Sequence, residues 1–136
     1  TARNNGKPLP ALAFFHIPFP EYNQAAQNEN ALLIGTRKEK ACAPAINTGL
    51  YAAMLNAGDV MGTFVGHDHD NDYVVAEKGT ALGYGRFSGD DSTYNNLRPC
   101  ARIIVVEEGQ RCFESWILED DGRIAHRMKF SNGKIE

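Results

Sequence analysis

The chain has 136 residues, of which 43% are hydrophobic and 23% are charged, and its formal net charge is −3 at pH 7. This length allows one domain, and the composition is ordinary for a folded globular protein. The small negative charge gives no electrostatic case for binding nucleic acid or an anionic membrane. No apolar run approaches the ~20 residues that a membrane-spanning helix needs.

The first half of the chain predicts two strands and two helices. Short apolar runs at residues 9–15 and 60–65 predict the strands. Pro20 suits the start of a helix over 21–28. Asn47 or Thr48 is expected to cap a second helix that runs to about residue 56, and Gly58 ends it. Residues 30–44 are mixed and charged, and we predict a loop with little regular structure there.

The second half of the chain reads as strands. Residues 72–76 and 80–84 predict two strands that turn at Lys78-Gly79, and a polar loop follows over 86–99. Residues 101–107, 110–119 and 123–130 predict three more strands, the last two joined by Asp120-Asp121-Gly122. The expected class is therefore α/β, sheet-rich and with few helices.

Three of the four histidines follow apolar strands. His16 follows the first run, and His67 and His69 follow the second. In an extended segment alternate side chains share a face, so His67 and His69 should point the same way while Asp68 points away. Ligands bind at the carboxyl ends of strands in open α/β sheets. The three histidines therefore predict a metal-binding edge, although solvated loop histidines explain the His-x-His spacing alone equally well.

The motifs around these histidines resemble a known superfamily. Gly66-His67-Asp68-His69 is similar to the last signature, Gly-His-x-His, of the calcineurin-like metallophosphoesterases. Ala13-Phe14-Phe15-His16-Ile17-Pro18 is similar to the signature that precedes it. Together with residues 14–22, 47–51 and 66–73, these motifs resemble the purple acid phosphatase-like branch over roughly residues 8–118.

This resemblance implies a fold, an activity and a ligand set. The fold would be an αββα sandwich, of which residues 1–136 form a single partial domain from its C-terminal portion. The activity would be that of a metal-dependent phosphoric ester hydrolase, a phosphomonoesterase or phosphodiesterase, acting on a phosphate-ester substrate. The resemblance implies two divalent ions (Mn, Fe or Zn), with His16 and His67 on one ion and His69 on the other.

The departures from the family pattern also carry expectations. The earlier signatures Asp-x-His and Gly-Asn-His do not occur, and Gly-Asp pairs occur only in other places. We therefore expect a C-terminal portion of a phosphoesterase that binds no metal, or one metal weakly, and is inactive by itself. The alternative is a non-catalytic binding or structural module that keeps part of the fold.

Other residues are weaker candidates. Asp70 and Asp72 could orient the metal-binding imidazoles through hydrogen bonds, or they could simply form a solvated acidic turn. Arg86, in a glycine-rich loop, could hold a phosphate bidentately, and its alternative is an exposed side chain on a flexible connection. His126 is expected at the surface. Exposed strand edges would favour a homodimer.

The cysteines are the last potentially reactive side chains in the sequence. They form an odd set of three, without the spacing of a metal cluster: Cys42, Cys100 and Cys112. We interpret them as buried or free thiols, and one disulfide among them is the alternative.

Overall fold

The structure, a computed structural model, describes residues 6–89 and 97–136, and residues 90–96 of the predicted polar loop lie outside the described part. A five-stranded sheet has the order β1-β3-β5-β4-β2. Its strands are β1 (Ala11–Phe14), β2 (Leu33–Ile34), β3 (Val60–Val65), β4 (Val74–Glu77) and β5 (Thr80–Tyr84). The helices are α1 (Glu21–Gln27) and α2 (Leu50–Ala57). Neither helix, within these described ranges, has the length and apolarity to cross a membrane.

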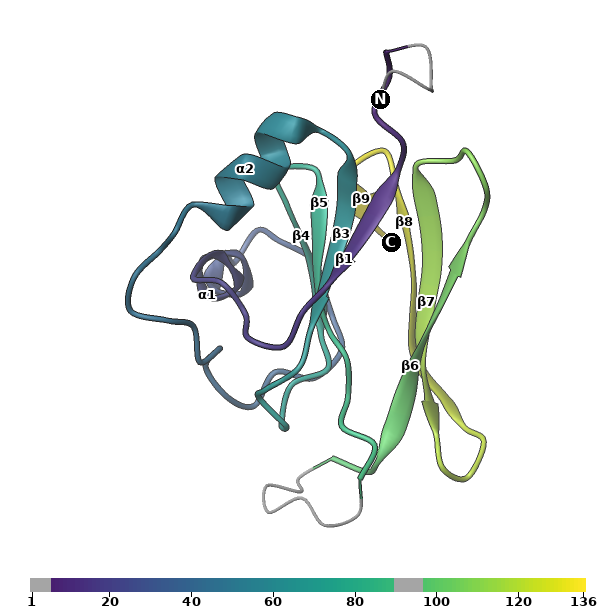
Figure 1. The fold of residues 1–136 in the computed structure, drawn as a ribbon. Helices are drawn as coiled ribbons and strands as arrows, with labels where there is room; N and C mark the ends of the chain where they lie inside the picture. The colour runs from purple at the N-terminus through teal and green to yellow at the C-terminus, as the bar shows by residue number, and fades with distance from the viewer. Residues whose placement is uncertain (1–5, 90–96) are drawn as a thin grey trace.

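A second sheet of four strands is antiparallel and keeps the chain order β6-β7-β8-β9. Its strands are β6 (Cys100–Val106), β7 (Cys112–Glu119), β8 (Ile124–Ser131) and β9 (Lys134–Ile135). Figure 1 shows this sheet facing one side of the first sheet, while α1 and α2 lie on the other side. The layers are thus helix, sheet and sheet, and the predicted sheet-rich α/β class is confirmed.

Three parallel strands position the candidate site. Strand β3 pairs in parallel with β1 on one side and β5 on the other, so their carboxyl ends meet at one edge of the sheet. Backbone pairing continues past the strands: the Gly66 N–H donates to the His16 carbonyl at 3.1 Å, and the Gly85 N–H donates to the Val65 carbonyl at 2.7 Å. The residues that follow these three strands are therefore held side by side.

The first sheet is buried on both faces, which explains its apolar strands. Its helix-facing side packs an aromatic cluster that includes Phe19, Tyr22, Tyr51, Tyr73 and Tyr84. Its other side packs on the second sheet through a cluster that includes Phe64, Val74, Phe113, Met128 and Phe130. The buried Tyr22 hydroxyl lies 2.8 Å from the Thr63 hydroxyl and donates to the Gly83 carbonyl at 3.1 Å, which fixes α1 on the sheet.

Three local features differ from the sequence predictions or were absent from them. Residues 30–44 have little regular structure, as expected, but they contain the two-residue strand β2 and a bridge between Arg37 and Asn71. Helix α2 has Gly49 as its left-handed N-cap, without a side-chain cap. The Asn47 side chain instead accepts a hydrogen bond from the Gly49 N–H at 2.9 Å, and this local turn displaces the expected cap. Strand β9 was not predicted.

Open strand edges occur in both sheets. Strand β1 is an edge of the first sheet and β6 is an edge of the second. Both edges carry exposed apolar side chains: Phe14 is 65% exposed, and Val105 and Val106 are 50% and 55% exposed. Such edges can pair with another chain, and the homodimer expected from the sequence stays a prediction.

The buried tyrosines predict how the fold responds to alkali. Burial raises the pKa of Tyr51 to about 12 and raises the pKa values of Tyr22, Tyr73 and Tyr84 further. The fold favours the neutral phenols, so their stabilisation is complete below the unfolded value of about 10 and is lost as the pH rises through the folded values. Phenolate absorbance and circular dichroism, followed together, should show at most one of the five tyrosines ionising before unfolding. Two or more tyrosines that ionise in the folded state would contradict this prediction.

Candidate metal centre

One pocket of about 200 Å³ brings the three predicted metal ligands together. His16, His67 and His69 all line it, together with Arg86 and Phe87. The rings of His16 and His67 meet edge to face, with centroids 5.2 Å apart. The His69 ring lies 5.6 Å from that of Phe87. The structure thus places the three imidazoles at one site, and their role as metal ligands stays a prediction.

The backbone at His67 differs from the extended geometry expected from the sequence. Strand β3 ends at Val65, and His67 has a φ of 73°, in the left-handed region. The Asp68 N–H donates to the Gly66 carbonyl at 2.9 Å, across a single residue. A positive φ inside such a hydrogen bond is the pattern of the rare, strained form of γ-turn. Strain of this kind clusters at functional sites, where the surrounding structure imposes it.

Asp68 turns into the protein. Its carboxylate accepts hydrogen bonds from the Tyr84 hydroxyl at 2.6 Å and from the Cys42 N–H, which lies 3.1 and 3.2 Å from its two oxygens. The side chain is buried. Burial, and then the hydrogen bond to Asp68, raise the pKa of Tyr84, so the phenol stays a donor. Asp68 therefore ties the histidine turn to the segment around Cys42.

Asn71 makes a second connection to the same segment. Its side-chain oxygen accepts from the backbone N–H groups of Lys38 and Glu39 at 3.1 and 3.2 Å, and its amide donates to the Glu39 carbonyl at 3.1 Å. Gly35 allows its segment to approach the Tyr73 backbone closely, because a Cβ at position 35 would lie 2.7 Å from the Tyr73 Cα. Nothing in the local sequence pattern signals this clamp, which depends on long-range pairing.

Asp70 and Asp72, the predicted supports of the histidines, have different surroundings. Asp70 is buried in the turn, where its backbone N–H donates to the Glu39 carboxylate at 2.8 Å. Asp72 is fully buried, accepts from the Thr36 N–H at 2.5 Å and pairs with Arg86. The alternative of a solvated acidic turn is wrong for both residues, because both residues are buried. Their support of the histidines stays a prediction.

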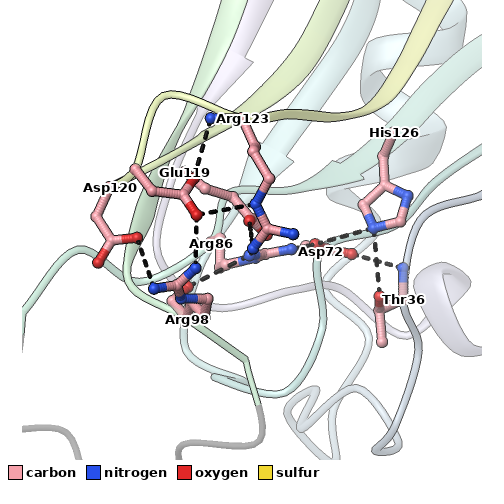
Figure 2. Close-up of polar contacts among 9 residues, drawn as sticks. Thr36, Asp72, Arg86, Arg98, Glu119, Asp120, Arg123 and His126 are labelled. Atoms are coloured by element: carbon pink, nitrogen blue, oxygen red, sulfur yellow. Dashed lines mark hydrogen bonds and ion pairs between the residues drawn. The ribbon is translucent and has the colours of Figure 1, made fainter.

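Arg86 is the centre of an ion-pair network between the two sheets. Figure 2 shows its guanidinium between Asp72 and Glu119. Its Nε donates to Asp72 at 3.0 Å, and its Nη1 donates to Glu119 at 3.1 Å and to the Arg98 carbonyl at 3.3 Å. Burial alone would lower the pKa of Arg86, but the hydrogen bond and charge of Asp72 and the contact with Glu119 raise it above its usual value.

These contacts bear on the two interpretations of Arg86. The interpretation of Arg86 as an exposed side chain on a flexible connection is wrong, because Arg86 is only 9% exposed. Bidentate phosphate binding stays a prediction, and it would require the guanidinium to give up at least one of its protein partners. The structure itself assigns Arg86 to holding Asp72 and Glu119 together.

His126, which was expected at the surface, keeps 31% of its side chain exposed but also has polar neighbours inside the protein. It has a φ of 52°, and it lies where β8 shifts register against β7. A bulge of this kind re-aims a side chain. The His126 Nε2 lies 3.5 Å from the Thr36 hydroxyl and 3.7 Å from the Asp72 carboxylate (Figure 2). His126 therefore belongs to the same network as Arg86.

The fold and the pocket together describe an α/β protein with a candidate histidine metal site. The chain is also similar in sequence to proteins that are named as phosphatases. Probable inactive purple acid phosphatase 29 of Arabidopsis thaliana is 43% identical over 109 residues, which cover 79% of this chain and 27% of the relative. Probable inactive purple acid phosphatase 14 of the same plant is 37% identical over 98 residues, 72% of this chain and 24% of the relative. Phosphatase DCR2 of Saccharomyces cerevisiae is 36% identical over 95 residues, 66% of this chain and 14% of that protein.

These relatives confirm the resemblance seen in the sequence. The curated homologues of this chain are purple acid phosphatase-like proteins of the calcineurin-like superfamily, and the matches agree with a C-terminal portion of that branch. The chain spans about a quarter of the length of the first two relatives. No protein-family model and no solved structure matches the chain.

Proposed function

We propose that this chain supplies part of the active site of a metal-dependent phosphoric ester hydrolase, a phosphomonoesterase or phosphodiesterase. The observation that carries the proposal is the meeting of His16, His67 and His69 at one pocket beyond the parallel strands β1 and β3. The phosphatase names of the homologues support the same reaction class.

The donor set fits divalent transition metals. Imidazole is a suitable ligand for Zn and Fe, and the pocket offers three such groups. Two bound divalent ions would polarise a phosphoryl oxygen and make a water nucleophilic near neutral pH. Three neutral imidazoles do not balance the charge of two such ions. We therefore propose that carboxylate ligands come from residues beyond this chain, and that Mn, Fe or Zn fills the complete site.

A non-catalytic module is the second candidate. It is favoured by the names of three relatives, which are called probable inactive purple acid phosphatases. In such a module the fold and the histidine pocket would persist while the complete ligand set would not.

A comparison of two polypeptides distinguishes the candidates. The 136-residue chain should hydrolyse p-nitrophenyl phosphate and its diester analogue negligibly, because positioning and charge stabilisation require the assembled metal site. The longest native polypeptide that contains this chain should hydrolyse one of them when Mn²⁺, Fe or Zn²⁺ is added. Robust metal-dependent turnover by the 136-residue chain would refute the proposed division of the site. No turnover by either polypeptide would favour the non-catalytic module.

A further inference from the structure

Cys42 lies beside the histidine pocket and forms a second group of potential metal ligands. One ligand atom each from Cys42, His67 and Asp68 can be chosen so that all three lie within 4.8 Å of one another. The sequence gives no hint of this cluster, because Cys42 is 25 residues away from His67 and is not part of a spaced cysteine motif. The fold alone brings the thiol to the histidine turn.

The position of Cys42 is fixed from two sides. On one side, the Asn23 side chain of α1 donates to the Ala41 carbonyl at 2.9 Å and accepts from the Ala41 N–H at 3.0 Å. On the other side, the Cys42 N–H donates to the Asp68 carboxylate. The Cys42 backbone is therefore held against the turn that carries His67, while the Cys42 side chain remains exposed.

The distances suit a metal ion after a small closure. Zinc binds sulfur at about 2.3 Å and nitrogen or oxygen at about 2.0–2.2 Å, so ligand atoms around a tetrahedral ion lie roughly 3.3–3.7 Å apart. The three atoms lie within 4.8 Å of one another, so they must close by up to about 1.5 Å. Cys42 and His67 are exposed and can move by side-chain rotation, whereas Asp68 is buried and held by Tyr84.

The charges favour this group over the three imidazoles. A thiolate and a carboxylate together balance the two positive charges of a divalent ion, which neutral imidazoles cannot do. A mixed sulfur, nitrogen and oxygen set suits Zn²⁺, which is borderline soft and accepts all three donor types. Hydrogen bonds to a ligating carboxylate are typical of real sites, and Asp68 already has them from Tyr84 and Cys42.

We propose that Cys42, His67 and Asp68 form a site for one zinc ion, with the fourth position open to water or to another ligand. Binding requires that the Cys42 thiol lose its proton to solvent, and sulfur then donates an electron pair to the metal without a change of oxidation state. The site uses the same His67 as the proposed phosphoesterase centre, and one neutral imidazole binds one ion, so in the 136-residue chain zinc at this site takes the place of an ion at that centre. The site requires neither His16 nor His69. It does not depend on the proposed catalytic activity.

Cobalt substitution tests the proposal on the full 136-residue chain. Co²⁺ should bind with one ion per chain and give a thiolate-to-cobalt charge-transfer band in the near ultraviolet, and Zn²⁺ should displace it. Cys42→Ser should abolish the band and weaken Zn²⁺ binding by more than the roughly 10–100-fold that loss of an outer-shell partner costs. Asp68→Asn should weaken binding, and circular dichroism must show that it still folds.

Two controls make the result specific. Cys112→Ser removes another thiol and should leave the band and the affinity unchanged. His16→Ala removes an imidazole of the phosphoesterase pocket and should also leave the band in place. If the parent chain gives no band, or if Cys42→Ser keeps the parent affinity for Zn²⁺, the proposal is wrong, whatever the activity assays show. Because Cys42 is exposed, its variant decides the question even if Asp68→Asn does not fold.

Discussion

His67→Ala and His69→Ala should each lower turnover by more than about 100-fold in the longest native polypeptide that contains this chain. Each removes a proposed direct ligand, and loss of an outer-shell partner already costs about 10–100-fold in affinity or activity. The measurement is the steady-state rate with p-nitrophenyl phosphate or its diester analogue at saturating metal. Circular dichroism must accompany it, because metal loss can lower the stability of the fold.

His126→Ala is the matched control for this prediction. His126 lies beside Asp72 and Thr36 rather than among the residues that line the pocket. Its removal should therefore lower stability slightly and leave the rate nearly unchanged. A normal rate in His69→Ala, or an equal loss in His126→Ala, would contradict the assignment of the histidine motif.

Asp72→Ala should lower the free energy of unfolding by about 3–5 kcal/mol, the usual cost of removing one partner of a buried ion pair. Among the residues that the structure describes, the substitution leaves Arg86 buried with only Glu119 as its charged partner, and it also removes the acceptor of the Thr36 N–H. Asp72→Asn should cost less, because the amide keeps one oxygen acceptor. Urea denaturation of the 136-residue chain measures both changes.

The control for the ion pair is a surface carboxylate. Asp121 pairs with Arg98 and Arg123 where all three side chains are exposed, and such pairs contribute little. Asp121→Ala should therefore leave the unfolding midpoint nearly unchanged. If Asp72→Ala had as small an effect, the network around Arg86 would not be a major source of stability.

The strands were predictable because their signal is local. Strands β3 and β5 read as continuous apolar runs, as strands covered on both faces do. The turn between β7 and β8 was visible in Asp120-Asp121-Gly122, and Gly122 indeed has a positive φ. Strand β2 was not predictable, because its two residues are ordered by pairing with β4 rather than by their own pattern.

The candidate site was predictable only in part, because some of it depends on long-range contacts rather than on local sequence patterns. Histidines at the ends of two strands could be expected to meet once the strands were assumed parallel, and they do. The turn at His67 and the approach of Cys42 could not be expected. Both depend on contacts between residues 35–42 and the histidine loop, which are far apart in the chain.

Metal content tests the central claim most directly. Elemental analysis after dialysis should find two divalent ions per molecule in the longest native polypeptide and fewer in its His69→Ala variant. The 136-residue chain should hold no more than one ion. Two tightly held ions in the 136-residue chain, or unchanged occupancy in the His69→Ala variant, would contradict the account of His16, His67 and His69 as one part of a shared metal site.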